Sequence, residues 1–208
     1  MKTVKKRQRT VRLISCEVFR PALDFLNVER RYPHLEITYL PSHLHLRPQQ
    51  LKQRLSQEIS KSAEGGERVI CLYGDCFPDI DAFCREHRAL KVPGHLCYEM
   101  LLGPERFNRY LDEMAGTYFV EQDVIQHFED YCVNPLGLED EEMRRCCFEH
   151  YQRLLYIRQP KDADLESSAC DIAGFLDLYI DISDADYSYL EASLNEVMQT
   201  TAGSKHER

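Results

Sequence analysis

Short apolar runs alternate with longer amphipathic stretches along most of the chain. Residues 11–16 and 68–73 are largely apolar, and residues 35–40 alternate apolar and polar positions with β-branched residues among them. The stretch 49–63 carries Leu and Ile at helical spacing and ends at two glycines. Strands that alternate with helices of about ten to fifteen residues are typical of a parallel sheet flanked by helices.

The same alternation continues to the end of the chain. Further strand-like runs lie at 90–92, 116–120, 154–157 and 178–182. Helical stretches lie at 139–151, 163–175 and 184–198. We therefore predict an α/β fold, with a mostly parallel sheet of about five to seven strands, helices on both faces and a helical insertion around residues 121–151.

The ends of the chain differ from the patterned region. Residues 1–10 are rich in Lys and Arg, and residues 200–208 are polar. We predict a single α/β domain over residues 11–199, a disordered basic tail at 1–10 and a polar tail at 200–208.

The composition of the chain bears on which partners it can bind and in which compartment we expect it. The formal net charge of −9 argues against nucleic-acid binding, because phosphates require a basic surface. No apolar run approaches the ~20 residues that span a bilayer, and the first residues lack the apolar centre of a secretory signal. We expect a cytoplasmic protein whose nine cysteines are reduced, since an odd count fits poorly with a disulfide framework.

Cysteine and histidine follow four of the predicted strands. They are Cys16 after the first, His43 and His45 after the second, Cys76 after the third, and His95 and Cys97 after the fourth. A parallel sheet brings such junctions to its carboxyl edge, where ligands bind. The chain has no Gly-x-Gly-x-x-Gly and no Gly-x-x-x-x-Gly-Lys-Ser/Thr motif, so nucleotide binding has no support from these motifs.

One interpretation of this edge is a metal centre. Cys16, Cys76, His95 and Cys97 supply three thiolates and one imidazole, a set that suits zinc or iron and that a corrinoid cobalt would also accept. The alternative is that each cysteine is a small buried residue, because the chain has no Cys-x-x-Cys pair. Cys71 and Cys84, on an apolar strand and an apolar helix face, are expected to be such core residues.

A second interpretation is a reactive thiol. Cys76 at the start of a helix would be the nucleophile, His45 or His95 would transfer protons, and Asp75 would act as a base near the thiol. Asp75 has a simpler alternative role, which is to shape the turn through its side chain.

Several short segments carry a resemblance to a known family. In order, they are Ile14-Ser15-Cys16, Leu44-His45-Leu46-Arg47-Pro48, Tyr73-Gly74-Asp75-Cys76, His95-Leu96-Cys97 with Leu101-Leu102-Gly103, and Gly116-Thr117-Tyr118-Phe119. This set resembles the prokaryotic family catalogued as domain of unknown function number 1638, over roughly residues 11–195.

The resemblance implies a setting in one-carbon metabolism, because members tend to be encoded near corrinoid-dependent methyltransferases and their activators. The family pattern has Cys-Gly after the first strand and Tyr-Gly-x-Cys-Gly after the third. This chain has Glu17 and Phe77 in place of those second glycines. We expect Phe77 to narrow the approach to Cys76 and to indicate a modified site or a different substrate.

Three functions are consistent with these patterns. The first is a metal- or thiol-dependent enzyme that acts on a small molecule at the Cys/His edge. The second is an accessory protein that holds a metal or cofactor at the same residues without converting it. The third is a protein with structural cysteines that docks a protein partner through residues 121–151.

Overall fold

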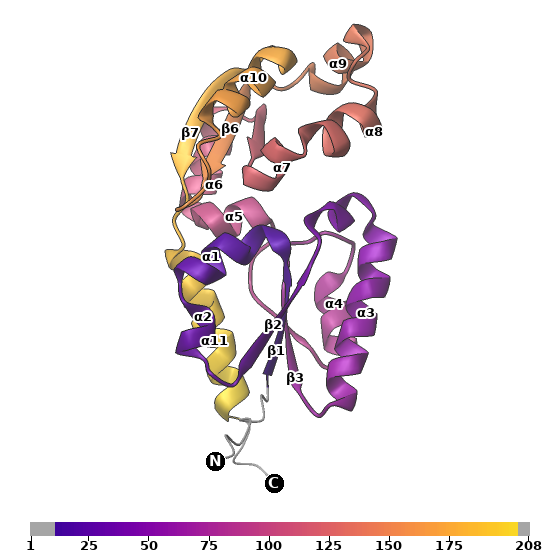
Figure 1. Ribbon diagram of the computed structural model, residues 1–208, viewed down its shortest axis with the longest axis vertical. Coiled ribbons are helices and arrows are strands. Elements are labelled where there is room, and N and C mark those ends of the chain that lie inside the picture. Colours follow the sequence, from indigo (N-terminus) through magenta and orange to yellow (C-terminus); the bar gives the residue numbers. More distant parts are fainter. Residues whose placement is uncertain (1–10, 204–208) are drawn as a thin grey trace, which may run out of the picture. The chain divides into compact units, whose positions relative to one another are not determined.

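The computed structural model describes residues 11–203 (Figure 1). Within these residues the chain forms two compact units. The first comprises residues 11–96 together with 191–203, and the second comprises residues 97–190. Each unit has its own parallel sheet.

The first unit is built on a four-stranded sheet of order β2-β1-β3-β4. The strands are β1 (Val11–Cys16), β2 (Leu35–Leu40), β3 (Arg68–Leu72) and β4 (Leu90–Lys91), and every neighbouring pair is parallel. The central strands β1 and β3 are almost entirely buried. Continuous apolar runs are typical of strands that helices cover on both faces.

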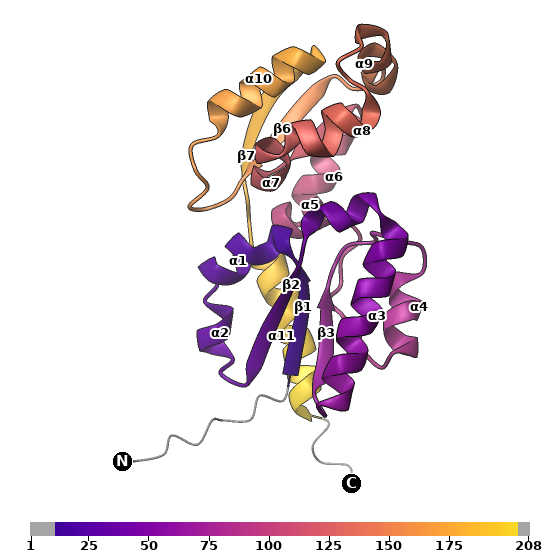
Figure 2. The same ribbon diagram turned by 45° about the vertical axis from the view of Figure 1, so that its right-hand side comes forward.

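Helices cover both faces of this first sheet. They are α1 (Arg20–Phe25), α2 (Val28–Arg31), α3 (Pro48–Glu64), α4 (Ile80–Glu86) and residues 191–203 of α11 (Ser188–Gly203), with short 3-10 turns η1 (Glu17–Phe19) and η2 (Ser42–Leu46). Figures 1 and 2 show α3 and α4 on one face and α1, α2 and α11 on the other.

Regular spacing explains how α3 packs on its sheet. Leu51, Leu55 and Ile59 recur at four-residue intervals on one side of the helix, and all three are buried. Pro48 lies in the first turn, where its missing N–H leaves no intrahelical hydrogen bond unmade. The helix thus presents one apolar stripe to the sheet.

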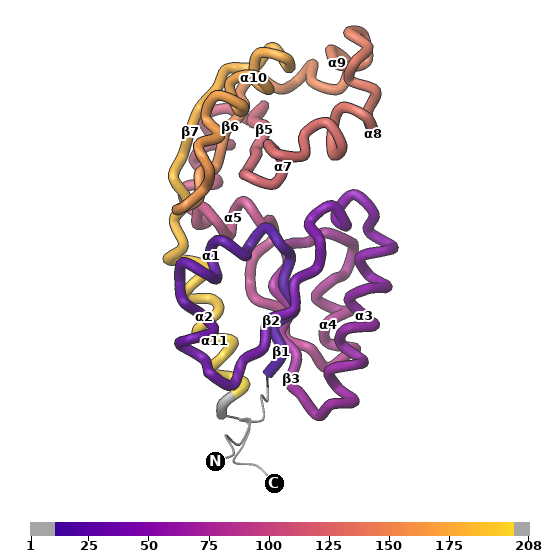
Figure 3. The backbone as a smooth tube through the Cα atoms, in the orientation of Figure 1, coloured from indigo at the N-terminus to yellow at the C-terminus, as the bar shows by residue number. Residues whose placement is uncertain are grey.

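The second unit has a three-stranded parallel sheet of order β5-β6-β7. The strands are β5 (Thr117–Val120), β6 (Arg153–Arg158) and β7 (Tyr179–Asp184). Figure 3 traces the chain through this unit. The helices are α5 (Cys97–Leu102), α6 (Pro104–Glu113), α7 (Gln122–Gln126), the π-helical η3 (Glu129–Val133), α8 (Asn134–Leu136), α9 (Glu141–Phe148) and α10 (Glu166–Leu176).

A cluster of buried side chains joins this sheet to its helices. Val120, Leu154 and Tyr156 of the strands pack with residues of α7, α9 and α10. The short helices between β5 and β6 therefore belong to the core of the unit. The prediction of a helical insertion around residues 121–151 is confirmed.

The predicted fold class is confirmed, with one difference in the division of the strands. The α/β architecture, the parallel strands and the helices on both faces are all present, but the seven strands found within residues 11–203 form two sheets rather than one. The reason is local. After the two-residue strand β4 the chain forms α5 and α6, and the next strand, β5, pairs with β6. Two compact units thus occupy the range that we expected to form a single domain, 11–199.

The predicted tails fall mostly outside the described residues. The basic segment 1–10 and residues 204–208 are not among them. Helix α11 extends to Gly203, beyond the expected boundary at 199, and the Thr200 and Thr201 hydroxyls donate to backbone carbonyls of the preceding turn. No helix within the described range is long and apolar enough to cross a membrane.

Candidate functional site

The strand order creates a switch point in the first sheet. From β1 the chain moves to β2 on one side, and it then returns to place β3 on the other side of β1. Ligands of open parallel sheets bind outside the carboxyl ends of the strands at such a point. Cys16, the last residue of β1, and the loop after β3 both lie at this edge.

A pocket lies directly after β3. It has a volume of about 570 Å³ and is lined by residues 75–82 together with Arg85. Cys76 is a half-buried member of this lining, and its N–H donates to the Gly74 carbonyl at 2.9 Å, which makes the turn tight. Pockets of roughly 300–1,000 Å³ are typical of small-molecule sites.

Asp75 connects this loop to the loop after β4. Its Oδ2 accepts a hydrogen bond from His95 Nδ1 at 2.9 Å, and its backbone N–H donates to the His95 carbonyl at 2.6 Å. Lys91 Nζ lies 3.3 Å from Asp75 Oδ1 and 3.8 Å from Asp81 Oδ1, and it donates to the Gly94 carbonyl at 2.8 Å. Two adjacent strand ends are thus joined through one carboxylate.

These contacts change the acidity of Asp75. Burial by itself would raise the pKa of this carboxyl group, but the hydrogen bond from His95 and the positive charge of Lys91 outweigh burial and hold the pKa below its ordinary value. Asp75 is therefore a carboxylate at neutral pH and can only accept hydrogen bonds. It follows that His95 Nδ1 is the donor.

Lys91 was not identified from the sequence as a residue of this site. Its side chain is only 5% exposed, although it lies in a two-residue strand. A lysine inside a predicted strand, between Leu90 and Val92, is the signal that could have identified it. Buried lysines are normally paired with carboxylates.

Phe77 lines the same pocket as Cys76, and its effect on the approach to Cys76 stays a prediction. Its ring is buried and packs edge-to-face on Phe83 of α4, with the ring centroids 5.4 Å apart. The same ring thus belongs both to the pocket lining and to the packing against α4. Glu17, the other departure from the family pattern, pairs with Arg20 at 2.9 Å on the exposed side of α1.

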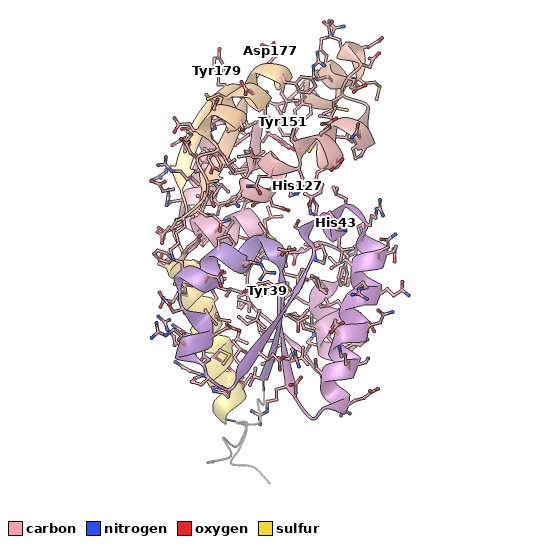
Figure 4. The ribbon with its side chains drawn as sticks, viewed as in Figure 1. Tyr39, His43, His127, Tyr151, Asp177 and Tyr179 are labelled. Atoms are coloured by element: carbon pink, nitrogen blue, oxygen red, sulfur yellow. The ribbon has the colours of Figure 1, made fainter. Side chains whose placement is uncertain are left out.

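His43 and His45 lie in η2, after the edge strand β2 (Figure 4 labels His43 and, on β2, Tyr39). The ring of His45 contacts the Ser42 carbonyl through Nδ1 at 2.7 Å. Strand β1 separates β2 from β3, and adjacent strands lie about 4.8 Å apart, so these two strand ends are roughly 10 Å apart. Of the two histidines that we predicted for proton transfer, His95 is the one that pairs with Asp75.

No three His, Cys, Asp or Glu side chains of the described residues are arranged so that they could hold a metal ion. Cys16, Cys76 and His95 belong to the first unit, and Cys97 opens α5 in the second. The metal centre at these four residues, with zinc, iron or a corrinoid, therefore stays a prediction. All nine cysteines lie in the described range and none forms a disulfide; Cys71 and Cys84 are buried, as expected of core residues.

Comparison with known proteins identifies the family. A family model described as "Protein of unknown function (DUF1638)" matches residues 39–194, which is more than half of the chain and includes the Asp75–Cys76 loop, Lys91 and His95. No curated protein and no solved structure matches the chain. The chain belongs to the family of proteins of unknown function DUF1638.

Proposed function

We propose that this protein is a thiol-dependent enzyme that acts on a small molecule at the pocket after β3. One observation carries the proposal. Cys76 lines the pocket and directly follows Asp75, whose carboxylate is hydrogen bonded to His95. A thiol, an imidazole and an orienting carboxylate are the groups that nucleophilic catalysis by cysteine requires.

The roles follow from the hydrogen bonds. Asp75 accepts from His95 Nδ1, so in the neutral form of the imidazole the proton lies on Nδ1 and Nε2 is the basic nitrogen. The His95 side chain is 82% exposed. In the proposed reaction His95 takes the proton of the Cys76 thiol and Sγ attacks the methyl carbon of a methyl-carrying substrate. The bond from that carbon to the rest of the substrate breaks, and the departing group receives the proton from His95.

The pocket wall suggests the kind of substrate. Phe77, Pro78 and Ile80 supply apolar surface, and Arg85 supplies a positive charge beside acidic residues. Since three carboxylates outnumber the single Arg85 in this lining, a small organic molecule with one polar or cationic group would match it. One-carbon metabolism, implied by the family resemblance, is the setting that we propose for it, with a methyl-carrying compound as substrate.

The reactivity of Cys76 tests the proposal. The full-length protein is treated at pH 7 with limiting iodoacetamide, and the rate of modification of each cysteine is followed by peptide mass spectrometry. We expect Cys76, although half-buried, to react several times faster than the exposed Cys146 and Cys170. Equal or slower reaction of Cys76 would refute a role as an activated thiol.

The variant His95→Gln distinguishes activation of the Cys76 thiol by the imidazole from simple accessibility of that thiol. In His95→Gln the pocket and Cys76 are retained, but the imidazole is lost. We expect the rate at Cys76 to fall toward that of Cys146, while the rates at Cys146 and Cys170 are unchanged. If Cys76 keeps its full rate in this variant, the imidazole has no part in its activation.

A further inference from the structure

The carboxyl edge of the second sheet contains buried polar side chains. Glu121 directly follows β5, Gln159 directly follows β6, and Tyr187 follows β7. Glu121 and Gln159 are each 2% exposed and Tyr187 is also buried. Polar side chains are seldom buried so completely unless they are bonded.

A tight turn brings Asp162 into this group. In the segment from Gln159 to Asp162 the Asp162 N–H donates to the Gln159 carbonyl at 3.0 Å. Pro160 occupies the second position and Lys161 has a φ of 72°, which are features of a type II turn. Asp162 Oδ2 then accepts from the Gln159 N–H at 2.8 Å and from the Tyr156 hydroxyl at 2.9 Å.

Two polar atoms of this group have no hydrogen-bond partner among the described residues. Gln159 Oε1 accepts from the Tyr187 hydroxyl at 2.9 Å, but Gln159 Nε2 is buried without an acceptor. Asp162 Oδ2 has its two bonds, but Asp162 Oδ1 is buried without a donor. Each side chain is held through one atom by a tyrosine hydroxyl, so neither can turn to satisfy the other atom.

Glu121, unlike Gln159 and Asp162, has a clear structural role at this edge. Its two carboxylate oxygens accept from the N–H groups of Asp123 and Val124, which caps α7. Both of its acceptors are therefore used by the fold. The free donor of Gln159 and the free acceptor of Asp162 have no such explanation, and unsatisfied buried groups are costly to retain.

We propose that the Gln159–Asp162 pair forms a second ligand site, and that it takes a primary amide or the equivalent edge of a lactam. Such a group offers a carbonyl oxygen to Gln159 Nε2 and an N–H to Asp162 Oδ1. The site lies at the carboxyl ends of parallel strands, where ligands of this class of sheet bind. It is separate from the thiol pocket, and neither proposal depends on the other.

Three small molecules of similar shape test whether the site pairs one donor, Gln159 Nε2, with one acceptor, Asp162 Oδ1. Acetamide has one acceptor and one donor group, acetate has only acceptors, and acetamidinium has only donors. Each is titrated into the ¹⁵N-labelled full-length protein while the Gln159 side-chain NH₂ signal, assigned by its loss in Gln159→Met, is followed by NMR. We expect a saturable shift with acetamide that is at least tenfold weaker with acetate and acetamidinium, and none at the exposed Gln50.

Two variants make the test specific. In Gln159→Glu the orphan donor becomes an acceptor, so the preference should change from acetamide to acetamidinium, followed through the Asp162 backbone signal. Tyr187→Phe removes the hydroxyl that donates to Gln159 Oε1 and should weaken acetamide binding several-fold. This second variant tests the proposal even if Gln159→Glu does not fold. No saturable shift, or equal shifts with all three molecules, would mean that the two atoms are satisfied by ordered water, and the proposal would be wrong.

Discussion

Asp75 and His95 are joined by two hydrogen bonds, one from the His95 ring to the Asp75 carboxylate at 2.9 Å and one from the Asp75 backbone N–H to the His95 carbonyl at 2.6 Å. The two residues are 20 positions apart and follow neighbouring strands. The pairing orients an imidazole beside the loop that carries Cys76. Each prediction about this site depends on that relationship.

Replacement of Asp75 by Asn should slow the alkylation of Cys76. Asn can still accept from His95, but it lacks the charge, and a hydrogen bond to a charged group contributes about 1.5–3 kcal/mol. A loss of about 1.5 kcal/mol corresponds to about a tenfold lower rate of Cys76 alkylation at pH 7. Asp171→Asn, an exposed carboxylate on α10, is the control and should leave the rate unchanged. A similar effect of both variants would rule out a specific role for Asp75.

Replacement of Lys91 by Met should destabilise the first unit. The variant keeps a side chain of similar length but leaves Asp75 and Asp81 without their shared cation and the Gly94 carbonyl without its donor. We expect a loss of about 2 kcal/mol in the free energy of unfolding, measured by urea denaturation. The pKa of Asp75 should also rise, because one of the two groups that lower it is gone.

Lys61→Met is the matched control for Lys91→Met. The Lys61 side chain is 79% exposed and lies 3.9 Å from Glu58, so its loss should cost less than about 0.5 kcal/mol. Equal losses in the two variants would show that the Lys91 contacts contribute no more than a surface ion pair.

Glu121 should make stability depend on pH. Burial raises its pKa from 4.5 to about 7 in the folded protein. A carboxyl with a raised folded-state pKa favours folding while it is protonated, so its contribution is greatest below pH 4.5 and falls as the pH rises toward 7. Over that window the stability of the wild type relative to Glu121→Gln should fall by up to about 3 kcal/mol. Parallel stability curves for the two proteins would contradict this prediction.

Lys161 should be in a strained conformation. Its φ of 72° lies in the left-handed region, which disfavours residues with a Cβ. Lys161→Gly should raise the free energy of unfolding by up to about 1 kcal/mol, because relief of the strain exceeds the entropy that glycine adds to the unfolded chain. Lys161→Ala keeps the Cβ and should give no gain. A stabilisation by Ala equal to that by Gly would mean that the side chain, not the backbone, is unfavourable.

The boundaries of the first two strands were predictable because their signals are local. The expected strands 11–16 and 35–40 coincide with β1 and β2, since apolar and β-branched runs that end at a turn or a proline are read directly from neighbouring residues. The division into two sheets was not predictable in this way. Strand–helix alternation is the same whether β5 pairs with β4 or begins a new sheet.

For the candidate site, only a location at the carboxyl edge of the sheet could be predicted from the sequence. Cys76 could be placed at the carboxyl edge because a turn after a buried strand is visible in sequence, and the strand order agrees with that position; its role stays a prediction. The partner of Asp75 was not predictable, because it depends on which strand lies beside β3. His45 follows β2, and β1 intervenes; His95 follows β4, the neighbour of β3. The buried Gln159 and the half-buried Asp162 gave no signal, since nothing in sequence distinguishes them from surface polar residues.

The pH dependence of Cys76 alkylation tests the central claim most directly. Iodoacetamide reacts with the thiolate, so the rate at Cys76 as a function of pH reports how far the thiol is ionised. If the Asp75–His95 pair activates Cys76, the wild-type rate should rise at a clearly lower pH than in His95→Gln, while Cys146 gives the same profile in both proteins. Identical Cys76 profiles in the two proteins would contradict the account.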